Sequence, residues 1–397
     1  MSASQDPRVQ AWEQGLSLPR YLYLDEDQYG RDAHWLRDNL WFLVDHESRI
    51  PNPGDFLLYE YNGESVIVIR DREGVVRAHH NVCRHRGSRI CAHSSGSVNV
   101  LVCPYHAWSY ALDGELRAAS YMPLNFQRER YALKPCHCEV ECGLIFVNLA
   151  ETAPDFSLFI GGVTSELEFH DIPHAKIAHR AVISTAANWK LVVENNLECY
   201  HCRPAHPTYW AAHPGTLGDP PLQDTALEPD AHAESEVARK FNAFVHGPNS
   251  TYQRNGRRRL IGGGFLTESE GGAPVAPLMG RASYDGFQTQ FLLGPLTTLI
   301  MNPDYTVLYN FRPRSVRQTD IEVIWLVKDT AVAGVDLDVA RLIAVWDTTL
   351  REDKTLLDYN QLGVASDAYQ PGPYSTWERS ASEFDRLYVA NVVNQRP

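Results

Sequence analysis

The sequence predicts an α+β protein made of a small antiparallel β domain and a larger mixed domain. The chain has 397 residues, a length that suits two domains better than one. Short runs rich in β-branched residues, separated by turn signals, fill residues 41–157. From residue 158 onward, strand-like runs alternate with helical periodicity, and a hydrophobic content of 44% supports packed cores.

The expected elements follow the chain in three parts. Residues 1–40 are expected to form a polar helical segment packed on the larger domain, with the anchors Trp12, Leu16, Tyr23 and Trp35. In the domain of residues 41–157 we expect strands at Ser65–Ile69, Val98–Val102 and Gly143–Leu149. In the domain of residues 158–397 we expect strands at Ala181–Thr185, Thr306–Phe311 and Ile321–Val327, and helices at Trp189–Tyr200 and Leu337–Asn360. Residues 215–272 are expected to be loop-rich.

Composition and charge exclude several kinds of partner. The net charge of -13 argues against nucleic acid, and the short basic run Arg254–Arg259 is expected to be a solvated loop. There is no run of about 18 apolar residues and no secretory pattern at the start of the sequence, so no membrane association and a cytoplasmic location are expected. In that compartment the eight cysteines are expected to be metal ligands or free thiols rather than disulfides.

Two Cys-His motifs in the smaller domain indicate a metal site. Cys83 and His85 form Cys-x-His, and after 17 residues Cys103 and His106 form Cys-x2-His. Two thiolates on one iron and two imidazoles on the other can hold a two-iron, two-sulfide cluster of raised reduction potential. A structural zinc site uses the same ligand types. The cluster is favoured because each loop contributes one ligand of each type, whereas zinc fingers group their cysteines and their histidines.

A second candidate metal site lies in the larger domain. His201 and His206 are five residues apart, and Pro204 is expected to end or distort the helix so that His206 can turn back toward His201. Two histidines with one carboxylate hold ferrous iron and leave positions open for oxygen and substrate. The acids of the second predicted helix are the candidates for that carboxylate, and spacing alone does not choose among Asp347, Glu352, Asp353 and Asp358.

The neighbours of this second site have separate expectations. Glu198 precedes His201 by three residues and is expected on the same side of a helix, where it can accept a hydrogen bond from the free ring nitrogen of His201. Cys199 and Cys202 have a Cys-x2-Cys spacing, but a thiol redox motif is not expected beside a histidine site. Three other cysteines are expected to be structural thiols: Cys136, Cys138 and Cys142. Cys91 is expected to pack beneath the first cluster loop.

Residues Asn81–Gly87 and Cys103–Trp108 resemble the Rieske domain of the ring-hydroxylating oxygenase family, large (alpha) subunit, and Gly143–Leu149 resembles the closing strand of that domain. The resemblance covers nearly the whole chain. It implies a 2Fe-2S Rieske cluster on the two Cys-His motifs, followed by a catalytic domain whose antiparallel sheet is covered by helices (helix-grip, START-like). It also implies a mononuclear Fe(II) held by His201, His206 and Asp353. It further implies a head-to-tail homotrimer in which Glu198 bridges to a cluster histidine of the neighbouring subunit.

The expected function follows from these sites and from a closer resemblance. No dinucleotide or flavin fingerprint is present, so a separate flavin and iron–sulfur reductase that uses NADH or NADPH is implied. Asn188–Cys202 is similar to glycine betaine monooxygenases, with stachydrine demethylases and carnitine monooxygenases nearby, and Tyr369–Ser375 adds to that likeness. Such enzymes use O2 to hydroxylate an N-methyl carbon of a quaternary ammonium substrate and so release formaldehyde.

A quaternary ammonium group suits an aromatic cage, and the candidate walls are Tyr209, Trp210, Phe287, Phe291, Tyr305 and Tyr309. Two other functions remain open. An aromatic-ring hydroxylase acting on an aromatic acid would use the same metal sites. A Rieske electron carrier with a docking domain is disfavoured, because a carrier has no use for His201, His206 and Asp353.

Overall fold

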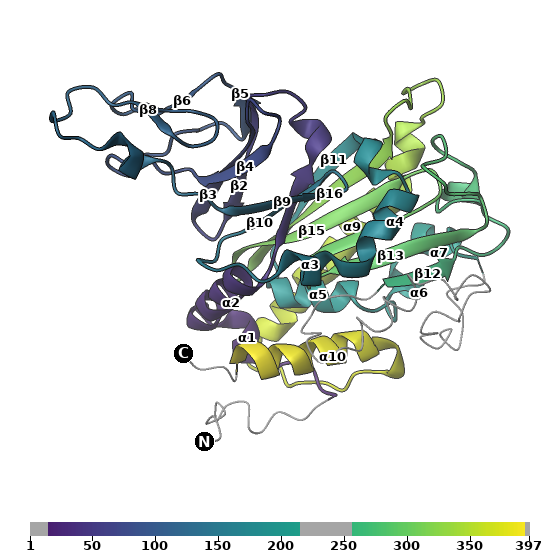
Figure 1. The fold of residues 1–397 in the computed structure, drawn as a ribbon. Helices are drawn as coiled ribbons and strands as arrows, with labels where there is room; N and C mark the ends of the chain where they lie inside the picture. The colour runs from purple at the N-terminus through teal and green to yellow at the C-terminus, as the bar shows by residue number, and fades with distance from the viewer. Residues whose placement is uncertain (1–14, 215–255, 394–397) are drawn as a thin grey trace. The chain divides into compact units, whose positions relative to one another are not determined.

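The computed structural model of the protein describes residues 15–214 and 256–393. The chain divides into two compact units (Figure 1). The small unit is Arg37–Phe156, and the large unit is Met1–Leu36 together with Ser157–Pro397. Within the described ranges, no helix combines the length and the apolar character needed to cross a membrane.

The small unit is built from three antiparallel sheets. One sheet has the order β1-β10-β9, a second β4-β3-β2-β5 and a third β6-β7-β8. Their bounds are Phe42–His46 (β1), Asp55–Tyr61 (β2), Glu64–Arg70 (β3), Val76–His80 (β4), Ser95–Ser97 (β5), Leu101–Val102 (β6), Ser109–Tyr110 (β7), Leu116–Ala118 (β8), His137–Glu141 (β9) and Leu144–Asn148 (β10). Asn62 and Gly63 join β2 to β3 with positive φ values of 44° and 86°, the backbone that a two-residue Asn-Gly hairpin requires.

Two of the three strands expected here form close to their expected places, as β3 and β10. The third, Val98–Val102, forms a strand only at Leu101–Val102, and the preceding strand is Ser95–Ser97. The backbone N–H of Val98 still donates to the Gly54 carbonyl at 3.0 Å, one step past the last β2–β5 pair, and the pairing with β2 ends there. The chain then leaves the edge of that sheet to begin the second Cys-His loop.

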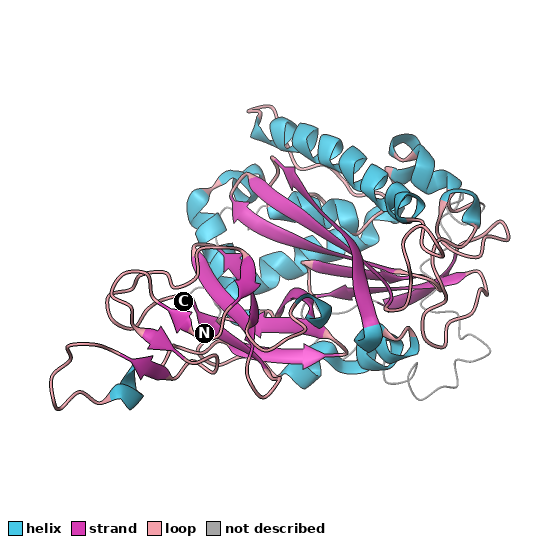
Figure 2. Cartoon of the chain, turned by 90° about the horizontal axis from the view of Figure 1, so that it is seen from above, coloured by secondary structure: helices cyan, strands magenta, loops and turns pink. Residues whose placement is uncertain are grey.

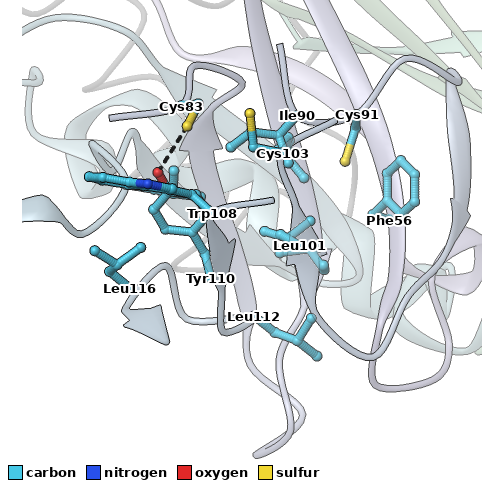
Figure 3. Packing of buried hydrophobic residues seen from close by; sticks show 13 residues of the cluster. Phe56, Cys83, Ile90, Cys91, Leu101, Cys103, Trp108, Tyr110, Leu112 and Leu116 are labelled. Atoms are coloured by element: carbon cyan, nitrogen blue, oxygen red, sulfur yellow. Dashed lines mark hydrogen bonds between the residues drawn. The ribbon is translucent and has the colours of Figure 1, made fainter. Parts of the chain in front are cut away.

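The core of the small unit lies beneath the two Cys-His loops. Cys83, Cys103, Trp108 and Tyr110 belong to one buried cluster (Figure 3), and Cys91 is a member of it, as expected. Tyr110 and Trp108 are almost completely buried. Burial of such large aromatic side chains fixes the position of the loops that carry the ligand candidates.

The large unit is a six-stranded antiparallel sheet with helices (Figure 2). The sheet order is β11-β16-β15-β14-β13-β12, with bounds Ala175–Thr185 (β11), Gly256–Leu260 (β12), Phe287–Leu293 (β13), Thr297–Met301 (β14), Thr306–Ser315 (β15) and Gln318–Lys328 (β16). The helices are Arg20–Leu24 (α1), Glu26–Asn39 (α2), Phe156–Ile160 (α3), Thr164–Phe169 (α4), Trp189–Asn196 (α5), Cys202–Ala205 (α6), Pro207–Ala211 (α7), Val339–Ala365 (α9) and Arg379–Tyr388 (α10). Helix α9 packs against β11, α5 and α7 and so brings its acids to the region of the two histidines.

Several expectations for this unit need correction. The first predicted helix ends at Asn196 and does not reach Tyr200. The basic run is not a loop throughout, because Gly256–Leu260 forms the edge strand β12, while Arg254 lies outside the described residues. Trp12 and residues 215–255 of the expected loop-rich stretch also lie outside them.

A buried polar network fixes α2 and α5 within the large unit. Lys190 and Asp32 form an ion pair whose side chains are fully buried. Asp32 also accepts hydrogen bonds from the Trp189 indole at 3.1 Å and from the Tyr388 hydroxyl at 2.7 Å. A buried charge pair of this kind tolerates little change, because removing one partner costs about 3–5 kcal/mol. The network therefore holds α5, whose C-terminal end leads directly to the histidine motif.

Candidate iron and iron–sulfur sites

The structure brings His201, His206 and Asp353 together. One candidate ligand atom from each lies within 4.8 Å of the others. One carboxylate oxygen of Asp353 lies 3.0 Å from His206 Nε2 and 3.3 Å from His201 Nε2. Two imidazoles and one carboxylate on one side of a common centre are the donor set of the ferrous facial triad. The residues therefore fit a single metal ion.

Electrostatics at this centre favour a cation. Burial lowers the pKa of His201, but hydrogen bonds to Asp353 and Glu198 outweigh it and raise the pKa to about 9. Burial alone would raise the pKa of the Asp353 carboxyl, yet the two histidines hold it below its usual value. The site thus attracts protons to the positions that face Asp353, and a metal cation at the same place would displace them.

The local sequence explains how two histidines five residues apart converge. Pro204 lies in the first turn of α6, where a missing N–H has no helical partner to lose. The break falls instead at His206, whose φ of -122° and ψ of 74° lie outside the helical region. His206 precedes Pro207, and a residue before proline is driven out of the helical region. The break thus depends on Pro207 rather than on Pro204 as predicted, and the two imidazole centroids lie 5.0 Å apart.

Each histidine is oriented by a glutamate. The Nδ1–H of His201 donates to the Glu198 carboxylate, and the other oxygen of Glu198 accepts from the backbone N–H of Tyr200. The Nδ1–H of His206 donates to Glu352 at 2.9 Å. Both imidazoles therefore offer Nε2 to the centre. Orienting a ligating histidine in this way is the usual role of a carboxylate that binds its other ring nitrogen. Glu198 makes its contact from the turn after α5, not from a helix as expected.

The four acids of the second predicted helix have distinct positions on α9. Asp353 alone of them joins the two histidines within 4.8 Å. Asp347 pairs with Arg351 at the surface, and Asp358 accepts hydrogen bonds from Thr185 and Ala186. Sequence reasoning considered Glu352 only as a ligand and missed its contact with His206. The available signal was its position next to Asp353.

Aromatic side chains gather beside His206. The ring centroid of Tyr209 lies 6.4 Å from that of His206 and 5.5 Å from that of Trp346, which is in turn 5.7 Å from Tyr309. Trp346 was not among the predicted walls. It could have been, because it precedes Asp353 by seven residues on α9 and two helical turns bring such a residue to the same face.

The other predicted walls have different contacts. Tyr305 donates its hydroxyl proton to the Glu268 carbonyl, and Trp210 lies against the Arg203 guanidinium at 5.7 Å. Phe291 is buried in the sheet, whereas Phe287 is partly exposed. Of the six predicted walls, Tyr209 and Tyr309 belong to the aromatic group with Trp346.

A buried polar pair lies behind the aromatic group. His213 Nε2 lies 2.8 Å from a Glu268 oxygen, and both side chains are fully buried. The other Glu268 oxygen accepts from the Trp346 indole N–H at 2.8 Å, and His213 Nδ1 lies 2.9 Å from the Tyr209 carbonyl. Neither residue was singled out from sequence. The pair fixes Trp346 and the backbone of Tyr209, and so holds the aromatic group in place.

The four ligand candidates of the small unit form a pair of neighbouring thiols and a pair of neighbouring imidazoles. Cys83 and Cys103 are buried, while His85 and His106 are exposed and their ring centroids lie 4.6 Å apart. Both loops close with the same hydrogen bond, from the fifth residue to the cysteine carbonyl, at 3.0 Å and 3.1 Å. Two thiols on the inner side and two imidazoles on the outer side fit a cluster with one iron of each kind.

The surroundings shift the pKa values of the two thiols in opposite directions, and burial raises that of Cys83. Burial raises the pKa of the Cys103 thiol, but the backbone N–H of Tyr105 and the neighbouring Cys83 thiol outweigh it and lower the pKa. The Tyr110 hydroxyl accepts from the Arg84 N–H at 3.0 Å, which leaves its own proton for Cys83 Sγ, 3.2 Å away (Figure 3). Hydrogen bonds to cluster sulfurs are one of the factors that set the reduction potential.

The remaining cysteines divide into two groups. Cys199 and Cys202 form a disulfide with a Cα–Cα distance of 4.9 Å, so the expectation that the eight cysteines avoid disulfides is wrong for this pair. Cys136 and Cys138 are free thiols, and burial raises the pKa of each to about 12. Cys142 is not part of a disulfide.

The chain resembles known proteins along nearly its whole length. Residues 173–393 match the family described as ring hydroxylating alpha subunit (catalytic domain), and residues 40–126 match the Rieske [2Fe-2S] domain. The glycine betaine monooxygenase oxygenase subunit of Pseudomonas aeruginosa (strain UCBPP-PA14) is 36% identical over 391 residues, 96% of this chain and 90% of that protein. The carnitine monooxygenase oxygenase subunit of Escherichia coli (strain K12) is 35% identical over 207 residues, 50% of this chain and 54% of that protein.

A solved structure shares the fold. The quaternary ammonium Rieske monooxygenase CntA, crystallised with the inhibitor MMV12, matches with a TM-score of 0.74 at 22% identity, over 98% of this chain and all of that one. The predicted fold class, a small β domain followed by an antiparallel sheet with helices, is confirmed. The matched domains also decide between iron–sulfur and zinc in favour of the cluster. The protein is therefore an oxygenase component that belongs to the Rieske-type ring-hydroxylating alpha-subunit family.

Proposed function

We propose that the protein hydroxylates an N-methyl group of a quaternary ammonium, betaine-type substrate and so removes that group as formaldehyde. The observation that carries the proposal is the convergence of His201, His206 and Asp353 beside the aromatic group. The whole-length likeness to a glycine betaine monooxygenase oxygenase subunit points to the same substrate class. Aromatic faces attract a permanent cation, and a buried site strengthens that attraction.

The proposed site has three parts with separate tasks. Cys83, His85, Cys103 and His106 hold the 2Fe-2S cluster. His201, His206 and Asp353 hold a ferrous ion, which when bound supplies the activation of O2. The faces of Tyr209, Trp346 and Tyr309 receive the trimethylammonium end of the substrate, because they are buried next to His206 and exclude water.

The reaction balances with electrons from outside the chain. One oxygen atom enters a C–H bond of the N-methyl group, and the other leaves as water with two electrons and two protons. In the resulting carbinolamine the C–N bond breaks, nitrogen keeps the electron pair, and the hydroxyl proton departs as formaldehyde forms. A separate flavin and iron–sulfur reductase supplies the electrons from NADH or NADPH. That dependence is our reason to place the enzyme in the cytoplasm.

We further propose a homotrimer in which Glu198 carries electrons to the iron from a neighbouring subunit's cluster. Glu198 is suited to this because one of its oxygens already binds His201 Nδ1 and its side chain remains 11% exposed. The cluster ligands His85 and His106 are exposed and so can face a partner. The electron path through Glu198 would then be complete only in the assembled trimer.

A panel of substrates tests the proposed function. The oxygenase, loaded with iron and supplied with electrons by a surrogate reductase, should release formaldehyde with glycine betaine, stachydrine, carnitine or a related N-methylated amine. Hydroxylation of an aromatic acid is the alternative, because the same metal sites would serve it. A diol or phenol from an aromatic acid, with no formaldehyde from any amine, would refute the proposed substrate class.

A further inference from the structure

The disulfide between Cys199 and Cys202 brackets the ligand candidate His201. It joins the two ends of a turn whose central residues are Tyr200 and His201, and the Cys202 N–H donates to the Cys199 carbonyl across the same turn at 3.2 Å. The Glu198 carboxylate binds the same two central residues, at the Tyr200 backbone N–H and at His201 Nδ1. One short segment thus carries the proposed electron bridge, an iron ligand and a disulfide.

The disulfide contributes little to holding the fold together. Closing a loop restricts an unfolded chain less when the loop is short, and only two residues separate these cysteines. The segments on both sides have their own anchors: the Ala205 N–H donates to the His201 carbonyl at 3.1 Å, and the Leu197 N–H to the Val193 carbonyl at 3.1 Å. The covalent bond therefore acts on the turn between them.

One end of the disulfide is accessible to small reagents. Cys202 is 5% exposed, but Cys199 is half-buried and its neighbour Tyr200 is 59% exposed. Cys136 and Cys138, by contrast, are free thiols in the same chain, which shows that the cysteines are not paired indiscriminately. Disulfides in reducing compartments are usually transient and catalytic or redox-sensing.

We propose that Cys199 and Cys202 are a redox-active pair whose oxidation state controls electron delivery through Glu198 and His201. This inference rests on the proposed role of Glu198 as the electron bridge. In the disulfide form the turn holds Glu198 on His201 and His201 beside Asp353. Reduction turns two bonded sulfurs into non-bonded neighbours that need roughly 3.5–4 Å between them. The turn must open to admit them, and a displacement of about 1 Å can cost about 100-fold in rate.

Both directions of the switch have a balanced chemistry. Hydrogen peroxide, formed when O2 takes two electrons and two protons without hydroxylating a substrate, oxidises the two thiols to the disulfide and leaves two molecules of water. A small-molecule dithiol reverses it. Its thiolate attacks Cys199 Sγ, the S–S bond breaks, and Cys202 leaves as a thiolate that takes up a proton. The second thiol of the donor then resolves the mixed disulfide and releases Cys199.

Counting thiols tests the pairing without any substrate. One sample of the holoenzyme is left untreated and a second is treated with a mild dithiol. Each is then denatured in air with N-ethylmaleimide present, and the masses of its peptides are measured by mass spectrometry. We expect the peptide with Cys199 and Cys202 to gain no label before treatment and two labels after it. The thiols of Cys136 and Cys138 should be labelled in both samples. Full labelling of Cys199 and Cys202 in untreated and in peroxide-treated protein would overturn the inference.

A single-turnover experiment tests the control of electron delivery. The cluster is reduced with the reductase and NADH, both thiol states are adjusted to equal iron content, and cluster reoxidation is followed after mixing with O2 and glycine betaine. We expect reoxidation at least tenfold slower in the dithiol form. The C199S/C202S double variant should be equally slow and indifferent to peroxide, whereas Cys138→Ser should respond as the wild type does.

The controls separate this inference from the proposed function. Equal reoxidation rates in the two thiol states of the wild type would overturn it, whether or not the double variant binds iron. The EPR spectrum of a ferrous–nitrosyl probe reports the surroundings of His201 without any turnover, and identical spectra in the two states would overturn it as well. A failure of every betaine as substrate would refute the proposed function but leave the thiol count and the nitrosyl spectra decisive.

Discussion

Glu352 offers a quantitative test of how the proposed iron ligands are held. Its carboxylate accepts a hydrogen bond from His206 Nδ1 at 2.9 Å, and its side chain is 32% exposed, compared with 11% for Glu198. A hydrogen bond to a charged group is worth about 1.5–3 kcal/mol, and partial exposure places this one in the lower part of that range. We therefore assign about 2 kcal/mol to the contact in Glu352→Ala, which corresponds to a roughly 30-fold loss of iron affinity.

The conservative variant separates hydrogen bonding from charge. Glu352→Gln keeps an oxygen that can accept from His206 Nδ1 but removes the negative charge, so its loss should be about 1 kcal/mol, or roughly fivefold. Asp347→Asn is the matched control. It removes the same charge from the same helix but breaks only a surface pair with Arg351.

The assay is an anaerobic competition for ferrous iron against a chromophoric chelator, with the cluster intact in every variant. The expected order of dissociation constants is wild type equal to Asp347→Asn, then Glu352→Gln, then Glu352→Ala. Wild-type affinity in Glu352→Ala would refute the reasoning. So would an equal loss in Asp347→Asn, because the effect would then come from the helix and not from the contact with His206.

Three further outcomes follow from the structure. Asp353→Asn should retain the Rieske EPR signal with two irons per chain instead of three, and three tightly held irons would exclude Asp353 as a ligand. Glu198→Gln should keep both metal sites filled but lose coupled turnover, so near wild-type product formation would remove Glu198 from the electron path. Burial raises the pKa of Asp385 from 3.8 to about 7, so this carboxyl contributes stability below pH 4 and loses it as pH rises through 7. The melting temperature should therefore fall from pH 5 to pH 8 more in the wild type than in Asp385→Asn, and parallel falls would contradict the assignment.

The sequence indicates the candidate metal sites because their chemistry is local. Thiolates and imidazoles at short spacings leave few alternatives, and the spacing of Cys83, His85, Cys103 and His106 already indicates two loops around one centre. His201 and His206 are indicated in the same way. The carboxylate is different, because α9 carries four acids and only the packing of that helix against α7 selects Asp353. The choice came from family resemblance and not from spacing.

The residues that sequence reasoning missed are those whose role depends on tertiary contacts. Glu268 and His213 are 55 residues apart and meet only because the chain folds between them. Glu352 was among the candidate carboxylate ligands, but its contact with His206 was not predicted. The disulfide was not expected, because disulfides are rare in cytoplasmic proteins and this argument outweighed the Cys-x2-Cys spacing. The turn at Tyr200 and His201 nevertheless places both sulfurs together.

The most direct test of the account is the stoichiometry of product to oxygen. With iron-loaded oxygenase, a surrogate reductase and the N-methylated amine that gives the highest rate, we expect about one formaldehyde for each O2 and each NADH consumed. The wild-type protein should carry three irons per chain, two in the cluster and one at His201, His206 and Asp353. Consumption of O2 with no formaldehyde from any methylated amine, while an aromatic acid is hydroxylated at full coupling, would contradict it.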